Sequence, residues 1–117
     1  MNGTLLRCYV HESEQHHGQP VWEALLQHAN DIGVRGGSVF KAMAGFGRHH
    51  VVHEGPRPFD LRAIQTIEIE FLVSDSEAHG LLEWVREQGI RVFYTTTSAR
   101  FGAMEGGAAA ASVGTVP

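Results

Sequence analysis

The sequence predicts an α+β domain in which four strands and two helices follow one another in the order β-α-β-β-α-β. Two observations support this prediction. Several short segments alternate apolar and polar residues, a pattern that is typical of half-buried strands. Two longer segments instead repeat apolar residues every three to four positions, as amphipathic helices do. The 117 residues suit a single domain with a core of moderate size.

The first strand is predicted at residues 5–12, where one face carries Leu6, Cys8 and Val10. The first helix is predicted within residues 18–33. Pro20 suits its first turn, where a missing N–H is harmless, and Gly33 suits the position just past its end. Its apolar stripe consists of Val21, Ala24, Leu25, His28, Ala29 and Ile32. A second strand, entered through glycines, is predicted at residues 36–45.

The second half of the chain repeats this order. Residues 64–73 alternate cleanly, with Ile67, Ile69, Phe71 and Val73 on one face and Thr66, Glu68, Glu70 and Leu72 on the other. The second helix is predicted at residues 74–89, because Ser74 and Glu77 have the spacing of a capping box and Gly89 suits its end. Its stripe consists of Ala78, Leu81, Leu82 and Val85. The last strand is predicted at residues 91–97, which are rich in β-branched and aromatic residues.

This order of elements predicts the split βαβ, or ferredoxin-like, arrangement. Two helices would then cover one face of an antiparallel four-stranded sheet. The opposite face would carry Leu72 beside Glu68 and Glu70. A sheet with one uncovered and partly apolar face often binds a partner, so we expect a homo-oligomer.

Two segments fall outside these elements. Residues 46–63, between the second and third strands, contain glycines and prolines and no sustained period. Loops of this length within a compact domain are usually functional or disordered. Residues 103–117 are small, lack aromatic side chains and predict a disordered tail, which leaves residues 1–102 as the folded domain.

Composition excludes several classes of function. The formal net charge of −4 argues against binding to nucleic acid, whose phosphates require a basic surface. Cys8 is the only cysteine, so it forms no intramolecular disulfide and no cysteine-based zinc site, and its apolar surroundings predict burial. No apolar run is long enough to insert into a membrane, and the N-terminal residues lack the pattern of a signal peptide. A cytoplasmic location is therefore expected.

The stretch GFGRHH, residues 45–50, is the main candidate for a binding site. Gly45 and Gly47 allow backbone N–H groups to approach a ligand closely, and successive N–H groups can bind an anion. Arg48 can donate two hydrogen bonds to a phosphate or a carboxylate. The alternative is a flexible loop with a solvated arginine, and two glycines alone do not exclude it.

The histidines of this loop allow a second hypothesis. His49, His50 and His53 lie close together in the sequence and could bind zinc or copper. Their spacing matches no established zinc motif, so solvated side chains are the favoured interpretation. His50 could instead contact an anionic ligand.

Two further residues are candidates by position. Glu12 ends the first strand and could bind a ribose hydroxyl, while Ser13 beside it could simply begin a turn. Arg91 and Arg100 flank the last strand, and either is also compatible with a solvated surface charge. No Ser-His-Asp, Cys-His or paired-carboxylate arrangement has recognisable spacing, so we expect that the protein is not an enzyme.

Together these residues carry a family resemblance that covers about residues 4–100. GFGR, followed by a long loop and then by IEIEFLVSD, resembles the PII signalling proteins. The segment YVHESEQHHGQPVWEALLQHANDIGVRGGSVFKAMAGFG resembles a PII-like family of uncharacterised domains, whose relatives also occur fused to fluoride-channel domains. The resemblance implies a ferredoxin-like fold, a homotrimer, and an adenine nucleotide bound in clefts between subunits.

The resemblance also implies a mechanism and a set of site residues. Residues 46–63 would be the T-loop, which passes the ligand state to a partner protein such as a transporter or a metabolic enzyme. PII proteins have a lysine-containing phosphate loop where this chain has only EQGIR, and this difference favours AMP, ADP or cyclic AMP over ATP. The family's usual glycine is Ala42 here, and the loop lacks the tyrosine that PII proteins modify. The implied ligand-binding residues are Glu12, Gly45, Phe46, Gly47, Arg48, His50 and Arg100.

Overall fold

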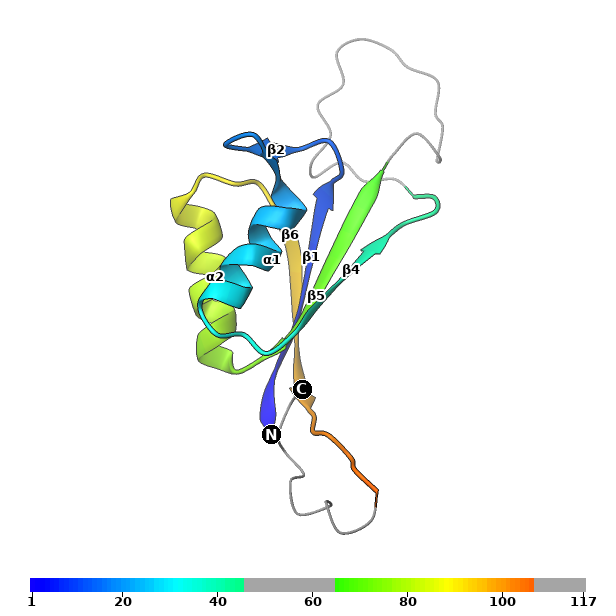
Figure 1. Cartoon of the computed structure of the whole chain (residues 1–117), viewed down its shortest axis with the longest axis vertical. Helices are drawn as coiled ribbons and strands as arrows, with labels where there is room; N and C mark the ends of the chain where they lie inside the picture. Colours follow the sequence, from blue (N-terminus) through cyan, green and yellow to red (C-terminus); the bar gives the residue numbers. More distant parts are fainter. Residues whose placement is uncertain (46–64, 107–117) are drawn as a thin grey trace.

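The computed structural model describes residues 1–45 and 65–106. Its elements are β1 (Asn2–His11), β2 (Gln15–His16), β3 (Gln19–Pro20), α1 (Val21–Asp31), β4 (Gly37–Lys41), β5 (Thr66–Val73), α2 (Asp75–Glu87) and β6 (Phe93–Arg100). The main sheet has the order β4-β5-β1-β6, and each neighbouring pair is antiparallel. Figure 1 shows α1 and α2 side by side on one face of this sheet. The ferredoxin-like arrangement predicted from the order of elements is confirmed.

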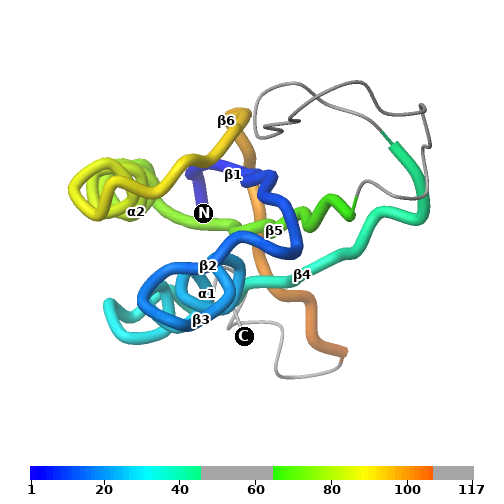
Figure 2. Tube along the Cα trace, turned by 90° about the horizontal axis from the view of Figure 1, so that it is seen from above, coloured from blue at the N-terminus to red at the C-terminus, as the bar shows by residue number. Residues whose placement is uncertain are grey.

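The core lies between the helices and the sheet, and the end-on view in Figure 2 separates these two layers. Both strand alternations are confirmed, because every predicted core residue of β1 and β5 is buried. Helix α1 contributes four buried residues and helix α2 contributes three. The fully buried side chains of largest volume are Phe71, Leu6, Leu25, Ile69, Leu81, Val10, Val73 and Cys8.

The ends of the helices follow the predicted local chemistry. The backbone N–H of Glu77 donates to Ser74 Oγ at 3.1 Å, and the backbone N–H of Ser74 donates to Glu77 Oε1 at 2.8 Å. This reciprocal pair is the capping box expected at the start of α2. Gly33 and Gly89 follow the two helices with φ values of 89° and 68°, which glycine adopts without steric strain.

The prediction that Ile32 belongs to the apolar stripe of α1 is wrong. Ile32 lies at the C-cap of α1 and is 45% exposed, whereas Val34 is only 8% exposed and joins the core. The positive φ of Gly33 reverses the chain direction, and the backbone N–H of Val34 then donates to the carbonyl of Ala29 at 2.9 Å. The helical period therefore ends before Ile32, and the reversal carries Val34 inward instead.

Pairing between strands extends two elements beyond their predicted bounds. Strand β1 begins at Asn2 rather than at residue 5, and β6 continues to Arg100 rather than to residue 97, because Asn2 and Arg100 are ladder partners. A short hairpin of β2 and β3, with positive φ values at its turn residues His17 and Gly18, precedes α1. Pro20 consequently lies at the N-cap of α1 rather than in its first turn.

The predicted loop at residues 46–63 lies outside the described residues. The predicted tail lies partly outside them, since only residues up to 106 are described. The boundary between a domain at residues 1–102 and a tail at residues 103–117 stays a prediction.

Candidate ligand-binding site

Residues 46–64 connect β4 to β5, and two backbone hydrogen bonds define the end of the sheet from which they leave. The N–H of Ala42, just past β4, donates to the carbonyl of Thr66 at 2.9 Å. The N–H of Glu12, just past β1, donates to the carbonyl of Gln65 at 2.8 Å. Three chain segments are thus held together at this end, and the predicted binding residue Glu12 lies among them.

An ion pair crosses the same end of the sheet. Lys41 Nζ lies 3.2 Å from Glu12 Oε2 and 3.3 Å from Glu12 Oε1. Lys41 is not among the site residues predicted from the sequence. A signal was available, because Lys41 is the only lysine in the sequence and lies four residues before the GFGR stretch.

The turn that follows β1 is held by its own side chains. Ser13 Oγ lies 2.6 Å from His11 Nδ1, and the N–H of Ser13 also reaches this nitrogen at 3.2 Å. Glu14 Oε1 accepts a hydrogen bond from the N–H of His11 at 2.9 Å. The structure therefore supports the interpretation of Ser13 as a turn residue.

The two arginines near the last strand lie at opposite ends of the sheet. Arg100 ends β6 and pairs with Asn2 at the start of β1. Because eight strand residues span about 25 Å, Arg100 does not share a site with Glu12 in the same chain. Arg91 instead precedes Phe93, which pairs with Tyr9 near the end of β1 that carries Glu12.

The remaining predicted site residues cannot be placed in the same way. Gly45 is described and is partly exposed, while Phe46, Gly47, Arg48 and His50 lie outside the described residues. The alternative metal ligands His49, His50 and His53 lie outside them as well. Among residues 1–45 and 65–106, no three His, Cys, Asp or Glu side chains are grouped so that they could hold a metal ion.

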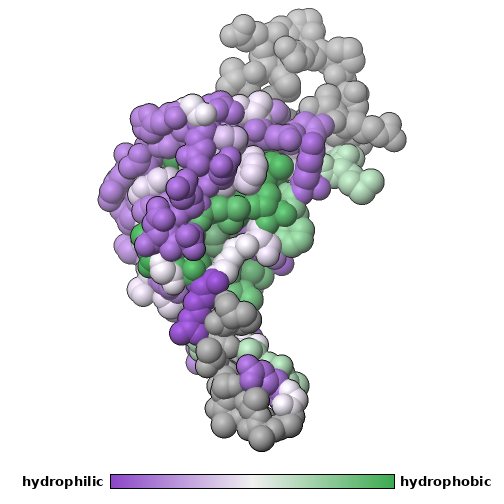
Figure 3. Space-filling view, in the orientation of Figure 1, coloured by the Kyte–Doolittle hydropathy of each residue, from purple (hydrophilic) through white to green (hydrophobic). Residues whose placement is uncertain are grey.

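The face of the sheet opposite the helices carries both apolar and charged side chains. Leu72 is 41% exposed there as predicted, together with Phe40 at 50% and Phe93 at 48%. In Figure 3 the outer surface of the helices is largely hydrophilic, and the apolar residues gather toward the sheet. This uncovered face is the part of the described molecule that is best suited to a second protein surface.

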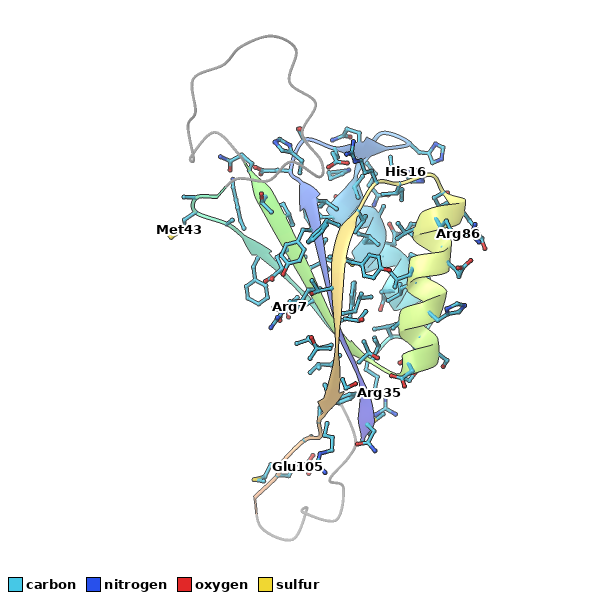
Figure 4. The ribbon with its side chains drawn as sticks, turned by 180° about the vertical axis from the view of Figure 1, so that it is seen from behind. Arg7, His16, Arg35, Met43, Arg86 and Glu105 are labelled. Atoms are coloured by element: carbon cyan, nitrogen blue, oxygen red, sulfur yellow. The ribbon has the colours of Figure 1, made fainter. Side chains whose placement is uncertain are left out.

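Polar contacts order the centre of this uncovered face. Arg7 projects away from the helices (Figure 4), and its Nε lies 3.2 Å from Glu70 Oε2 and 4.0 Å from Glu68 Oε1. Tyr9 packs against Phe93 with ring centroids 5.9 Å apart. Burial and, after it, the hydrogen bond to the Glu68 carboxylate raise the pKa of Tyr9 above its ordinary value.

A hollow of about 280 Å³ lies on the other side of the molecule, between the β2–β3 hairpin and the two helices. His28, which was predicted in the apolar stripe of α1, stacks on Trp84 there with ring centroids 4.1 Å apart and an interplanar angle of 9°. His16 meets the edge of Trp84 and lies 3.2 Å from Gln88 Oε1. These contacts join the hairpin to α2 and account for the histidines as packing residues.

Comparison with protein families gives a direct match. The model of the family DUF190, described as "Uncharacterized ACR, COG1993", matches residues 3–100. The chain belongs to this family. A UPF0166 protein of Aquifex aeolicus (strain VF5) is 29% identical over 82 residues, which cover 70% of this chain and 77% of that protein.

Solved structures share the fold of this family member. CPII of Thiomonas intermedia K12, bound to ADP, AMP and acetate, matches with a TM-score of 0.62 and 14% identity, covering 87% of this chain and 90% of CPII. CPII bound to ADP, AMP and bicarbonate matches with a TM-score of 0.61, also at 14% identity, covering 88% and 96%. A protein of Thermus thermophilus that is described as PII-like matches with a TM-score of 0.56 and 19% identity, covering 85% and 88%.

These matches confirm the PII-like resemblance noted in the sequence. They also agree with the four-stranded sheet and the two helices on one of its faces. Neither helix in the described part of the chain is long and apolar enough to cross a membrane.

Proposed function

We propose that this protein is a PII-like regulatory protein that binds an adenine nucleotide, namely AMP, ADP or cyclic AMP. The observation that carries the proposal is the shared fold with CPII, whose structures contain ADP and AMP together with acetate or bicarbonate. The ligand would occupy clefts between the subunits of a homotrimer. The T-loop, residues 46–63, would change its state on binding and contact a partner such as a transporter or a metabolic enzyme.

The placement of the predicted residues supports a cleft between subunits. Glu12 and the chain leading to Gly45 lie at one end of the sheet, while Arg100 lies at the other. Arg100 could therefore meet the ligand only from a second copy of the chain. Phe46, Gly47, Arg48 and His50 would complete the site from the loop side, with Arg48 donating to the phosphate groups.

The uncovered face of the sheet supports the proposed assembly. Phe40, Leu72 and Phe93 expose large apolar side chains on this face, and burying them between copies would be favourable. A cyclic trimer is a closed assembly, so it would cover this face on every copy and leave none open for further growth.

We propose a regulatory rather than a catalytic role, because no catalytic arrangement is recognisable in the sequence. After long incubation with the protein, ADP and AMP should be recovered unchanged by chromatography. Steady conversion of either nucleotide would contradict this part of the proposal.

Calorimetric titration with ADP and AMP tests the binding function directly. Wild-type protein should bind at least one of them, and Arg48→Ala should weaken binding by about 1.5–3 kcal/mol if the guanidinium makes a charge-assisted hydrogen bond. Arg86→Ala is the matched control, because Arg86 pairs with Glu83 on the outer surface of α2, far from the sheet end (Figure 4). Absence of nucleotide binding by the wild-type protein would refute the proposed function.

The proposed assembly is tested separately by light scattering after size-exclusion chromatography. A homotrimer should have three times the chain mass of 12.8 kDa. A monomer at all concentrations would refute the trimer, and with it a cleft that joins Glu12 of one copy to Arg100 of another.

A further inference from the structure

The Lys41–Glu12 ion pair spans an intervening strand. Lys41 ends β4 and Glu12 follows β1, whereas β5 lies between these two strands in the sheet. Neighbouring strands are about 4.8 Å apart, so the two side chains together bridge about 10 Å across the start of β5. The pair therefore crosses the first residues of β5, which follow residues 46–64 in the chain.

The backbone anchors of both residues are independent of the ion pair. Lys41 is a ladder partner of Ile67, and the N–H of Glu12 donates to the carbonyl of Gln65. Removing either charged group would leave these backbone contacts in place. The pair can consequently open without a change in the sheet.

The two carboxylates of this turn have different roles. Glu14 Oε1 accepts the N–H of His11 at 2.9 Å, and the backbone carbonyl of Glu14 accepts the N–H of Val21. Glu14 is thus part of the turn that leads into α1. The Glu12 carboxylate contacts the Lys41 ammonium instead.

The ion pair is accessible to solvent, and replacing one of its charged partners by a ligand costs little free energy. The side chains of Lys41 and Glu12 are 55% and 40% exposed. An ion pair in such a position contributes little stability, because water screens it and ordering two long side chains is unfavourable. A phosphate group carries up to two negative charges and three acceptor oxygens, so it can replace a single carboxylate at a lysine.

We propose that Lys41 is an anion-binding residue of the nucleotide site and that the Glu12 carboxylate is its internal competitor. In the unliganded chain Glu12 neutralises the Lys41 ammonium. A phosphate group of the ligand displaces this carboxylate and takes its place on Lys41. This inference rests on the proposed function, and it makes Lys41 a determinant of preference for phosphate-bearing ligands.

The competitor model predicts opposite effects for the two partners. Glu12→Gln removes the competing charge but keeps an oxygen that can accept a ribose hydroxyl, so ADP affinity should rise, by up to about fivefold. Lys41→Met removes the anion-binding charge, so ADP affinity should fall by at least about tenfold. Lys41→Arg keeps the charge and should retain most of the binding.

The controls come from a second exposed ion pair. Glu83→Gln changes the net charge of the protein as Glu12→Gln does, but it removes a partner of Arg86 on α2. It should leave ADP affinity unchanged. Thermal unfolding followed by circular dichroism would verify that every variant is folded.

Calorimetry with two probes, ADP and inorganic pyrophosphate, distinguishes the outcomes. Tighter binding by Glu12→Gln together with weaker binding by Lys41→Met supports the inference, and the same signs with pyrophosphate assign the effect to phosphate rather than to ribose. Binding of ADP that neither substitution alters overturns the inference and leaves the proposed function intact. Weaker ADP binding by Glu12→Gln, or an equal gain in Glu83→Gln, also overturns the competitor role. If neither wild type nor Glu12→Gln binds either probe, the inference fails. The proposed function fails with it only if AMP and cyclic AMP do not bind either.

Discussion

The substitution Gly3→Ala tests how closely β1 packs against the end of β5. Gly3 is buried, and an ideal Cβ at this position would lie only 2.1 Å from the backbone oxygen of Val73 and 3.0 Å from Phe101 Cε1. Real Cβ contacts stay beyond about 3 Å, so the backbone itself must move by nearly 1 Å. The Val73 oxygen belongs to the main chain of a buried strand residue and cannot rotate aside as a side chain would.

The size of the effect can be worked out for two ways of relieving the clash. If the strands move apart locally, overpacking costs about 1–3 kcal/mol. If the first residues of β1 separate from the sheet instead, the two hydrogen bonds between Met1 and Phe101 are lost, at about 1 kcal/mol each. Alanine also reduces the conformational freedom of the unfolded chain, and this raises the free energy of unfolding by about 0.5–1 kcal/mol. The free energy of unfolding should therefore fall by about 1–2 kcal/mol.

Urea unfolding, followed by tryptophan fluorescence and circular dichroism, measures this change. Gly80→Ala is the matched control, because Gly80 is exposed within α2 and a Cβ there meets no atom within 4 Å. Its free energy of unfolding should rise by about 0.5–1 kcal/mol, owing to the better helix propensity of alanine. A Gly3→Ala variant as stable as the wild type would contradict the predicted clash with Val73, and so would stability changes of the same sign in both variants.

Three further predictions follow from the described contacts. Ser74→Ala removes the capping box of α2 and should lower the free energy of unfolding by about 1 kcal/mol in the same urea assay; an unchanged midpoint would contradict the role of the cap. Burial raises the pKa of Cys8 from 9.0 to about 12, so between these pH values the folded chain keeps a proton that the unfolded chain releases. The free energy of unfolding of the wild type should therefore fall by about 1.4 kcal/mol per pH unit relative to that of Cys8→Ala. A difference between the two proteins that stays constant from pH 9 to pH 11 would contradict this. Phe40→Glu on the uncovered sheet face should reduce the mass of the assembly measured by light scattering, because it puts a charge into the proposed interface. Ile32→Asp, at an exposed position beyond α1, should leave this mass unchanged. An assembly of full mass in Phe40→Glu would place the interface elsewhere.

Local patterns were sufficient for much of the fold. The alternation of Ile67, Ile69, Phe71 and Val73 correctly separated the buried face of β5 from the face that carries Leu72. Burial on one side of a strand imposes a period of two, which is visible within a few residues. The capping box at Ser74 and the glycines that end both helices were equally visible, because their hydrogen bonds join residues close in sequence.

The candidate site was less accessible to sequence reasoning. The position of Arg100 beside the last strand makes it a candidate, yet pairing with Asn2 places it at the end of the sheet opposite Glu12. Lys41 is absent from the residues predicted from the sequence, because its contact with Glu12 depends on β4 and β1 lying on either side of β5. No spacing within a single element indicates such a neighbour.

The sequence by itself therefore determined the order of the four main strands and two helices, the buried faces of β1 and β5, and the glycines that follow both helices. These features depend on contacts within one or two turns of chain, and the residues that make them are adjacent in the sequence. Only the tertiary structure decided the full lengths of β1 and β6, the reversal that buries Val34 instead of Ile32, and the ion pair across the start of β5. The strand lengths and the ion pair depend on contacts between segments far apart in the chain. The packing of α1 against the sheet decides which of the two neighbouring apolar side chains, Ile32 or Val34, is buried.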